Sequence, residues 1–455
     1  MSHSSHAQAC LRPRRSPSLP RAVIEAVLLA IMAGAQAQTP SSPVTPLSVG
    51  DAVRAAVDRA AAPEAADATA RAAREMAVAA AQRPDPVLRL SLDNVPTDGP
   101  DRFSTTRDFM TQRSVALTQT FTRDDKRRAR AERFEREAEA ARADRRARVA
   151  AVQREAATAW FERRAAEQRL ELLRAKRDET RLQVEAVEAA LRGRRGNLAD
   201  AMAARDAVAQ LDQALLGARA ELVNARRMLA RWTGGPDEQR LADAPSLERH
   251  ALVAHTVADR LRHHPDLAQL EAREATAIAE AAVARAEREP DWSAELMFSQ
   301  RGSRYSNMVS VGVSLPLPWD RPQRQDRELA ARLAQADALR AEREEAAREH
   351  LAQTENWIET WRAALARLAL IDREREPLAQ QRVDAALAAY RGGGAPLAAV
   401  LEARRLALAQ RMERIEVELE TARLWSRLEF LIVDLDTDIA KPNAAAPAAD
   451  QGATR

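Results

Sequence analysis

Four histidines lie close together in the sequence, and clustered imidazoles are a common way to bind a transition metal. They are His250, His255, His263 and His264. Adjacent residues face different ways on a helix, so His263 and His264 do not point at one ion. No thiol or carboxylate joins the group at the spacing of a metal motif. We therefore interpret these residues as exposed histidines near helix ends and expect no metal site.

Motifs for catalysis or cofactor binding are also missing from the sequence. The stretch Gly193-Arg194-Arg195-Gly196 lacks the Gly-Lys-Ser/Thr ending of a phosphate-binding loop. No His-Glu-x-x-His motif occurs, and the single cysteine, Cys10, has no partner for a disulfide. We therefore expect a protein that is not an enzyme and that needs no cofactor.

Two glycine-marked turns are better candidates for function. The first contains Gly193 and Gly196, and the second contains Gly392-Gly393-Gly394. Glycine permits positive φ, so these residues allow a helix to reverse its direction. Asp200 follows the first turn and Glu402 follows the second. A carboxylate early in a helix is also stabilised by the helix dipole, which gives Asp200 a purely structural alternative role.

The composition of the chain favours long helices to position these turns. Glycine is scarce, with 14 residues, aromatic residues make up 4% of the chain, and charged residues make up 30%. Alanine, arginine, glutamate and leucine are the strong helix formers, and they are abundant. After residue 40 no stretch reaches the roughly 18–20 apolar residues of a membrane-spanning helix, which excludes a polytopic helical membrane protein.

The N-terminus has the pattern of a secretory signal peptide. Four arginines, the last at Arg21, precede an apolar run over 22–34, and Ala35-Gln36-Ala37 follows as a small-x-small cleavage site. We predict a signal peptide at 1–37; an anchor helix is the alternative, but the apolar run is too short for one. Cleavage removes four arginines and one glutamate from 70 basic and 67 acidic residues. Basic and acidic residues are then equal in number, so we expect no nucleic-acid partner.

The chain contains an internal repeat. Ala62-Pro63-Glu64 matches His264-Pro265-Asp266, and Ala159-Trp160-Phe161-Glu162 matches Asn356-Trp357-Ile358-Glu359. Several such matches in one order indicate a tandem duplication. We predict a first repeat at 47–236 and a second at 247–435, each with short helices, two strands and a long helical hairpin. Residues 38–46 and 440–455 are rich in Pro, Ala and Ser and are predicted to be a disordered linker and tail.

Each repeat is predicted to hold one very long helix and a return helix. A stripe of mostly apolar or small residues, at alternating steps of three and four, runs from Val149 to Leu191, and another runs from Val208 to Trp232. This spacing predicts a coiled coil. The expected helices cover 48–62, 64–82, 124–191 and 198–232 in the first repeat, and 247–262, 266–288, 323–390 (with a kink at Pro377) and 397–435 in the second.

Four segments alternate apolar with polar or small residues and are predicted to be β-strands, at 87–93, 114–121, 293–301 and 309–317. Four strands are too few to close a barrel, and open edges cannot face lipid. If the strands lie in a membrane, three chains must share one barrel of twelve strands. Phe121, Trp292 and Trp319 fall at the strand ends nearest the helices, where membrane-interface aromatics occur. A soluble sheet or a coiled-coil rod would explain parts of this pattern without a membrane.

The order of these elements resembles the TolC-type outer membrane efflux proteins over about 47–435. Leu47-Ser48-Val49-Gly50-Asp51-Ala52-Val53 is similar to the opening helix of that family, and His264-Pro265-Asp266-Leu267 to its second-half counterpart. The stretch from Tyr390 to Ala403, a Tyr-x-x-Gly turn followed by an acidic, apolar helix start, resembles the family's most specific motif. Leu90–Pro96 and Lys126-Arg127-Arg128 are most similar to the CzcC heavy-metal branch.

The resemblance implies an internally duplicated α+β fold. Long α-helical coiled-coil hairpins would join four β-strands per chain that complete a trimeric 12-stranded transmembrane β-barrel. The protein would lie in the cell outer membrane, extend into the periplasm, and act as the passive exit duct of a tripartite efflux system. A periplasmic adaptor and an inner-membrane RND pump would be its partners, and heavy-metal cations or small toxic compounds its cargo. The exit duct of a type I protein secretion system and a secreted coiled-coil structural protein without a pore stay open as alternatives.

The resemblance also gives roles to the two turns. They would form the periplasmic tip, where the adaptor docks, and Asp200 and Glu402 would line the tunnel gate. The position that matches Asp200 in the second repeat is Ala399, and Glu402 lies one helical turn further on. This departure from the family pattern speaks against two complete acidic rings. The residues of the expected tip are Gly193, Gly196, Tyr390, Gly392, Gly393 and Gly394.

Overall fold

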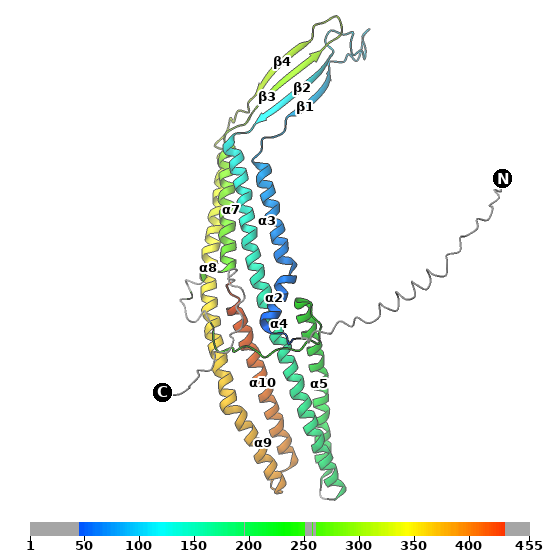
Figure 1. Ribbon diagram of the computed structural model, residues 1–455, viewed down its shortest axis with the longest axis vertical. Helices are drawn as coiled ribbons and strands as arrows, with labels where there is room; N and C mark the ends of the chain where they lie inside the picture. Colours follow the sequence, from blue (N-terminus) through cyan, green and yellow to red (C-terminus); the bar gives the residue numbers. More distant parts are fainter. Residues whose placement is uncertain (1–44, 195, 251–256, 258–260, 433–455) are drawn as a thin grey trace, which may run out of the picture. The chain divides into compact units, whose positions relative to one another are not determined.

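The computed structural model describes residues 45–194, 196–250, 257 and 261–432 (Figure 1). The predicted signal peptide at 1–37 and tail at 440–455 lie outside these residues, as do most of the linker at 38–46 and of the helix at 247–262. The chain divides into two units, 1–46 and 47–455, and the fold described below is that of the second unit.

Long helices make up most of this unit, and local sequence signals set their ends. The Ser48 hydroxyl accepts a hydrogen bond from the Asp51 N–H at the start of the first helix, at 3.1 Å. Gly234, with φ of 67°, ends the helix that begins at Leu198. The helices are α2 (Val49–Arg59), α3 (Ala61–Ala80), α4 (Asp124–Arg192), α5 (Leu198–Thr233), α7 (Pro265–Glu287), α8 (Gln325–Leu370), α9 (Glu376–Arg391) and α10 (Leu397–Glu429).

The helix expected over 323–390 is interrupted rather than simply kinked. A π-helical segment, Ile371–Arg375, separates α8 from α9, and Pro377 lies in the first turn of α9. Proline has no N–H to donate, and its ring crowds the carbonyl four residues earlier, so an inserted residue in the preceding turn relieves the conflict. The last helix, α10, ends at Glu429, six residues before the predicted end at 435.

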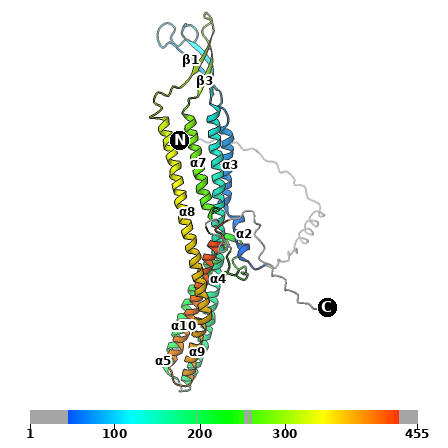
Figure 2. The same cartoon turned by 90° about the vertical axis from the view of Figure 1, so that its left-hand side faces the viewer.

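The longest helix, α4, is the element against which the others pack. It contacts α2, α3, α5, α7 and α10 (Figures 1 and 2). Trp160 of α4 is fully buried, and its indole N–H donates to the Leu47 carbonyl at 2.8 Å. Within the described ranges, no helix combines the length and the apolarity that crossing a lipid bilayer requires. Buried residues of the predicted stripe on α4 are Val149, Val152, Ala156, Ala159, Arg163, Ala166, Leu170, Leu173, Thr180 and Val187.

The four strands form one antiparallel sheet in the order β1-β2-β3-β4. They are β1 (Val87–Asp93), β2 (Gln112–Phe121), β3 (Trp292–Gln300) and β4 (Met308–Ser314). The central pair, β2 with β3, joins the two halves of the chain, and Leu117 lies opposite Leu296. Strand β4 ends earlier than the predicted 317, because Pro316 and Pro318 cannot donate to a ladder.

The sheet has one apolar and one polar face. On the polar face, the hydroxyls of Ser114 and Ser299 lie 3.0 Å apart, and the Thr118 hydroxyl donates to Glu295 at 3.0 Å. On the other face, apolar residues follow one another across all four strands and are exposed. A sheet whose apolar face stays exposed needs an apolar environment or partner. The residues of this face are Leu88, Leu90, Leu92, Val115, Leu117, Leu296, Phe298, Val309, Val311 and Val313.

Candidate functional site

The strand ends nearest the helices hold an aromatic pair. Phe121 ends β2 opposite Trp292, which begins β3, and their rings stack with centroids 4.2 Å apart. Next to them, Lys126 at the start of α4 pairs with Asp291 at 3.1 Å, and the lysine side chain is only 6% exposed. Trp319 lies between β4 and α8 and is 91% exposed. Two of the predicted interface aromatics therefore pack together, and the third points outward alone.

The first glycine turn connects α4 to α5, and its geometry differs from the expectation. Gly193 has φ of −76°, and the left-handed residue is Arg194, with φ of 54°. Gly196 is required for a different reason: a Cβ there would lie 2.6 Å from the Leu191 backbone nitrogen. The chain thus needs glycine at 196 for close approach of the backbone, not for a positive φ. Asn197 then starts α5 by accepting a hydrogen bond from the Ala199 N–H at 2.8 Å.

The second glycine turn connects α9 to α10, and here Gly393 supplies the positive φ, 73°. The helices next to the two turns share one small apolar core. Val187 of α4 is buried in this core, and Tyr390 of α9 packs against it partly buried. Both helical reversals therefore lie at the same end of the helices (Figure 2). The remaining buried members of this core are Ala201 and Ala204 of α5 and Leu397 and Val400 of α10.

The two predicted gate carboxylates lie in different surroundings. Asp200 is half-buried in the first turn of α5. Glu402 is exposed on α10 and accepts hydrogen bonds from Arg405 at 2.7 and 2.8 Å. The hydrogen bond from Arg405, with its positive charge, lowers the pKa of Glu402. Glu402 also lines a groove of about 400 Å³ together with Lys176 and Arg404, and Asp200 does not line it. The negative charge of Glu402 is therefore compensated by Arg405, whereas Lys176 and Arg404 of the groove pair with Glu179.

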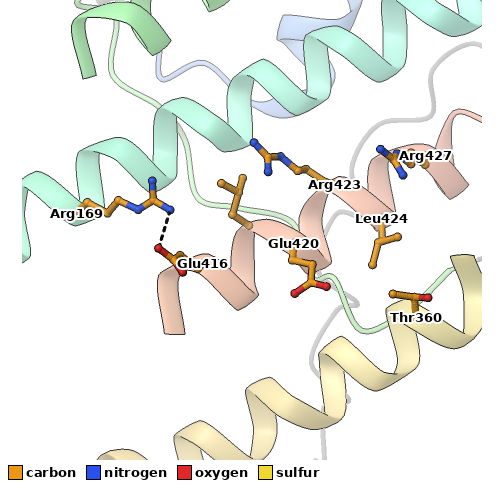
Figure 3. Close-up of a pocket in the computed structure, with 8 residues that line it drawn as sticks. Arg169, Thr360, Glu416, Glu420, Arg423, Leu424 and Arg427 are labelled. Atoms are coloured by element: carbon orange, nitrogen blue, oxygen red, sulfur yellow. Dashed lines mark ion pairs between the residues drawn. The ribbon is translucent and has the colours of Figure 1, made fainter. Parts of the chain in front are cut away.

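A second groove, of about 470 Å³, lies between α4, α8 and α10 (Figure 3). Charged side chains line most of it. Arg169 faces Glu416 at 3.8 Å, and Arg423 pairs with Glu162 at 2.6 Å. Binding sites for small molecules are mainly apolar with a few polar groups. Because its charges are paired between helices, this groove resembles a helix–helix packing surface more than a small-molecule binding site.

A side-chain cluster that the sequence analysis missed joins α7 to α8. His264 caps the N-terminus of α7, where its Nδ1 accepts the Asp266 N–H at 3.2 Å. Its ring packs against the ring of His350 on α8, with centroids 4.4 Å apart. Spacing along the sequence grouped His264 with His263 and could not reveal His350, which belongs to another helix. His263 is exposed, as predicted, and takes no part, whereas His264 is buried, so the prediction of an exposed histidine is wrong there.

Burial sets the protonation of His264. Its side chain is 3% exposed. Burial, followed by the neighbouring His350 and Arg154, lowers the pKa of His264 to about 4, while Asp266 acts in the opposite direction. The imidazole is therefore neutral at neutral pH.

Comparison with known proteins identifies the second half of the chain. Residues 257–432 match the family model described as outer membrane efflux protein. The resemblance to outer membrane efflux proteins that the sequence predicts is therefore confirmed over this segment. No curated protein sequence matches the chain.

Solved structures of outer membrane channels share the fold. The outer-membrane channel OprN has a TM-score of 0.71 at 22% identity, with 86% of this chain and 90% of that chain covered. VceC from Vibrio cholerae has a TM-score of 0.68 at 18% identity, with 84% and 95% covered. CusC has a TM-score of 0.69 at 17% identity, with 85% and 92% covered. The mostly helical architecture with a small four-stranded sheet is thus that of outer membrane channels.

Proposed function

We propose that this chain, whose residues 257–432 carry an outer membrane efflux protein domain, is the exit duct of a tripartite efflux system. The observation that carries the proposal is the four-stranded sheet. Its apolar residues form one continuous exposed face across all strands, and most of its polar residues lie on the other face, with Arg113 and Gln300 at one end of the apolar face. A barrel wall in a bilayer has this arrangement, with lipid on one side and an aqueous lumen on the other.

The edges of the sheet support assembly into a trimer. β1 and β4 are the edge strands, and in the described part of the chain neither edge pairs with a further strand. Unpaired backbone groups are too costly in lipid, so each edge must meet the edge of another chain. Pairing of β1 with β4 of the next chain closes a ring, and three chains give a barrel of twelve strands. We therefore place the protein in the outer membrane as a homotrimer whose helices extend into the periplasm.

The other partners follow from the helical end of the molecule. The shared core that joins the α4–α5 and α9–α10 turns makes them one tip, and we assign the docking of a periplasmic adaptor to it. An inner-membrane RND pump would then supply the energy. Similarity of Leu90–Pro96 and Lys126-Arg127-Arg128 to the CzcC branch favours heavy-metal cations as cargo, with small toxic compounds as the wider class.

Disulfide crosslinking tests the assembly. Cys10 is the only cysteine, so replacing it with Ser gives a clean background. Ser91→Cys on β1 combined with Ser310→Cys or Gly312→Cys on β4 samples two registers on the polar face. We expect a ladder that ends at three chains. Ser114→Cys with Ser310→Cys is the control, since β3 lies between these strands. A ladder that ends at two or four chains, or the absence of any ladder, would contradict the proposed trimer.

Transport is tested separately, in cells and in bilayers. A strain that lacks the gene should become more sensitive to divalent heavy metals, and complementation should restore resistance. Purified protein should form conducting pores in planar bilayers, which a coiled-coil protein without a pore would not do. Loss of secretion of a polypeptide, with unchanged metal and drug resistance, would instead favour a type I secretion duct.

A further inference from the structure

We infer that His264, Asp266 and His350 form a binding site for a borderline divalent cation such as Zn²⁺, which joins the start of α7 to α8. The three residues offer one ligand atom each, and these atoms all lie within 4.8 Å of one another. Two imidazoles and one carboxylate are a donor set that suits Zn²⁺, with water in the remaining position.

The positions of the three side chains favour a site rather than a chance contact. His264 is buried at the N-cap of α7, and Asp266 follows in the first turn, so both are anchored to one rigid element. The Asp266 carboxylate lies 4.0 Å from Nδ1 of His264 and is 42% exposed, which leaves it room to move toward an ion. His350 approaches from α8, and α7 and α8 pack along each other.

Only small movements would be needed to complete the site. Zn²⁺ binds imidazole nitrogen at about 2.0–2.1 Å, so tetrahedral ligand atoms lie about 3.4 Å apart. The ligand atoms of the three residues are already within 4.8 Å, and the partly exposed Asp266 and His350 can close the rest by side-chain rotation.

Two features of the site limit its affinity. Nδ1 of His264 now accepts the Asp266 N–H. If Nδ1 binds the ion, its lone pair leaves that N–H; if Nε2 binds it, Nδ1 carries the proton and can no longer accept. Either way the ion competes with the helix cap. The guanidinium of Arg154 on α4 is also close enough to act on His264 and repels a cation. We therefore expect affinity in the micromolar range.

The inference does not depend on the proposed channel function, because binding is measured without transport. Tag-free, chelator-treated protein in detergent would be titrated with ZnCl₂ by calorimetry. We expect one Zn²⁺ per chain and a Zn²⁺-dependent rise in melting temperature. His350→Gln and Asp266→Asn should each weaken binding at least tenfold. His263→Gln is the matched control, since His263 is the exposed neighbour of His264, and it should leave the affinity within twofold.

One further variant should act in the opposite direction. Arg154→Gln removes the repelling charge, so it should tighten Zn²⁺ binding severalfold. Circular dichroism would show that each variant is folded. The inference is overturned if the parent protein binds no Zn²⁺ at concentrations on the order of 100 μM. It is also overturned if all variants, including His350→Gln, bind Zn²⁺ as the parent does, because the ion would then lie elsewhere.

Discussion

Glu402 and Arg405, one turn apart on α10, form an ion pair with two hydrogen bonds. Asp200 lies on α5, and the position that matches it in the second repeat is the uncharged Ala399. A carboxylate that is already paired with a guanidinium contributes little negative potential to a nearby pore. If acidic residues at the tip select the permeating ion, the unequal surroundings of these two carboxylates should give them unequal effects.

We predict that Asp200→Asn lowers the cation selectivity of the pore and relieves block by divalent cations, because rings of carboxylates attract cations. Glu402→Gln should change both properties less, since its charge is compensated by Arg405. Single-channel recordings with and without divalent cations would measure this. Unchanged selectivity and block in Asp200→Asn would remove Asp200 from the gate and leave it the role of a helix-start residue.

The two faces of the sheet should tolerate charge very differently. Val311 lies in the middle of β4 on the apolar face and is 76% exposed, and its neighbour Ser310 lies on the polar face. Val311→Arg should cost roughly 2–4 kcal/mol of folding free energy if the residue lies at the bilayer midplane. Ser310→Arg should assemble almost normally.

The measurement is the amount of folded trimer in isolated outer membranes, compared between these two variants. Equal loss of trimer in both would mean that the sheet does not separate lipid from lumen. Equal tolerance of both would mean that the strands do not lie in a membrane.

Acidification should destabilise the junction of α7 and α8. The pKa of His264 is lowered to about 4 from an ordinary value of 6.5, so the unfolded chain binds this proton more readily than the folded chain. The stabilising contribution is fully present above about pH 6.5 and is lost as the pH falls toward 4. Its size is up to about 3 kcal/mol per chain by the conversion of 1.36 kcal/mol per pKa unit.

Thermal unfolding in detergent, measured between pH 7 and pH 4 with a chelator present, would test this effect. His264→Asn keeps an oxygen that can cap α7 but removes the titrating group, so it should flatten the pH dependence. His263→Asn is the control and should behave as the parent protein. A pH dependence that is as steep in His264→Asn as in the parent would assign it to other groups.

The glycines of the two turns should differ in their tolerance of alanine. A Cβ at Gly196 would meet the Leu191 backbone at 2.6 Å, whereas a Cβ at Gly392 would lie in ordinary contact with the Ala388 carbonyl at 3.5 Å. Gly196→Ala should therefore cost about 1–3 kcal/mol, as other overpacked sites do. Gly392→Ala should be nearly neutral. Limited proteolysis of the turns would report the difference, and equal cleavage of the two variants would contradict it.

Sequence reasoning predicted best the features that depend on local periodicity. Steps of three and four select the buried stripe of α4, and alternation separates Val311 from Ser310, because each pattern is fixed by the geometry of one element. It also could have found the pairing of Glu402 with Arg405, since residues three apart on a helix are neighbours.

The features that it missed depend on contacts between distant segments. His350 meets His264 only because α7 and α8 pack together. In the first turn, position 196 requires glycine because the Leu191 backbone approaches it closely, and residue propensities for turns or helices do not reveal such an approach. Pro377 signalled a kink, but not the π-helical segment Ile371–Arg375 that precedes it.

The pairing of β2 with β3 has a consequence for how the chain folds. Their contact joins residues such as Ser114 and Ser299, which are separated by 185 positions, and everything from α4 to α7 lies between them. Such non-local pairings form slowly, because the entropy cost of closing the long loop comes before the hydrogen bonds of the ladder can offset it. A chain that stops before Trp292 would be left with a two-stranded ribbon, too little for independent stability. The sheet therefore cannot be completed before the second half of the chain is present, and premature termination or proteolysis between the two halves should leave a helical product without the four-stranded sheet.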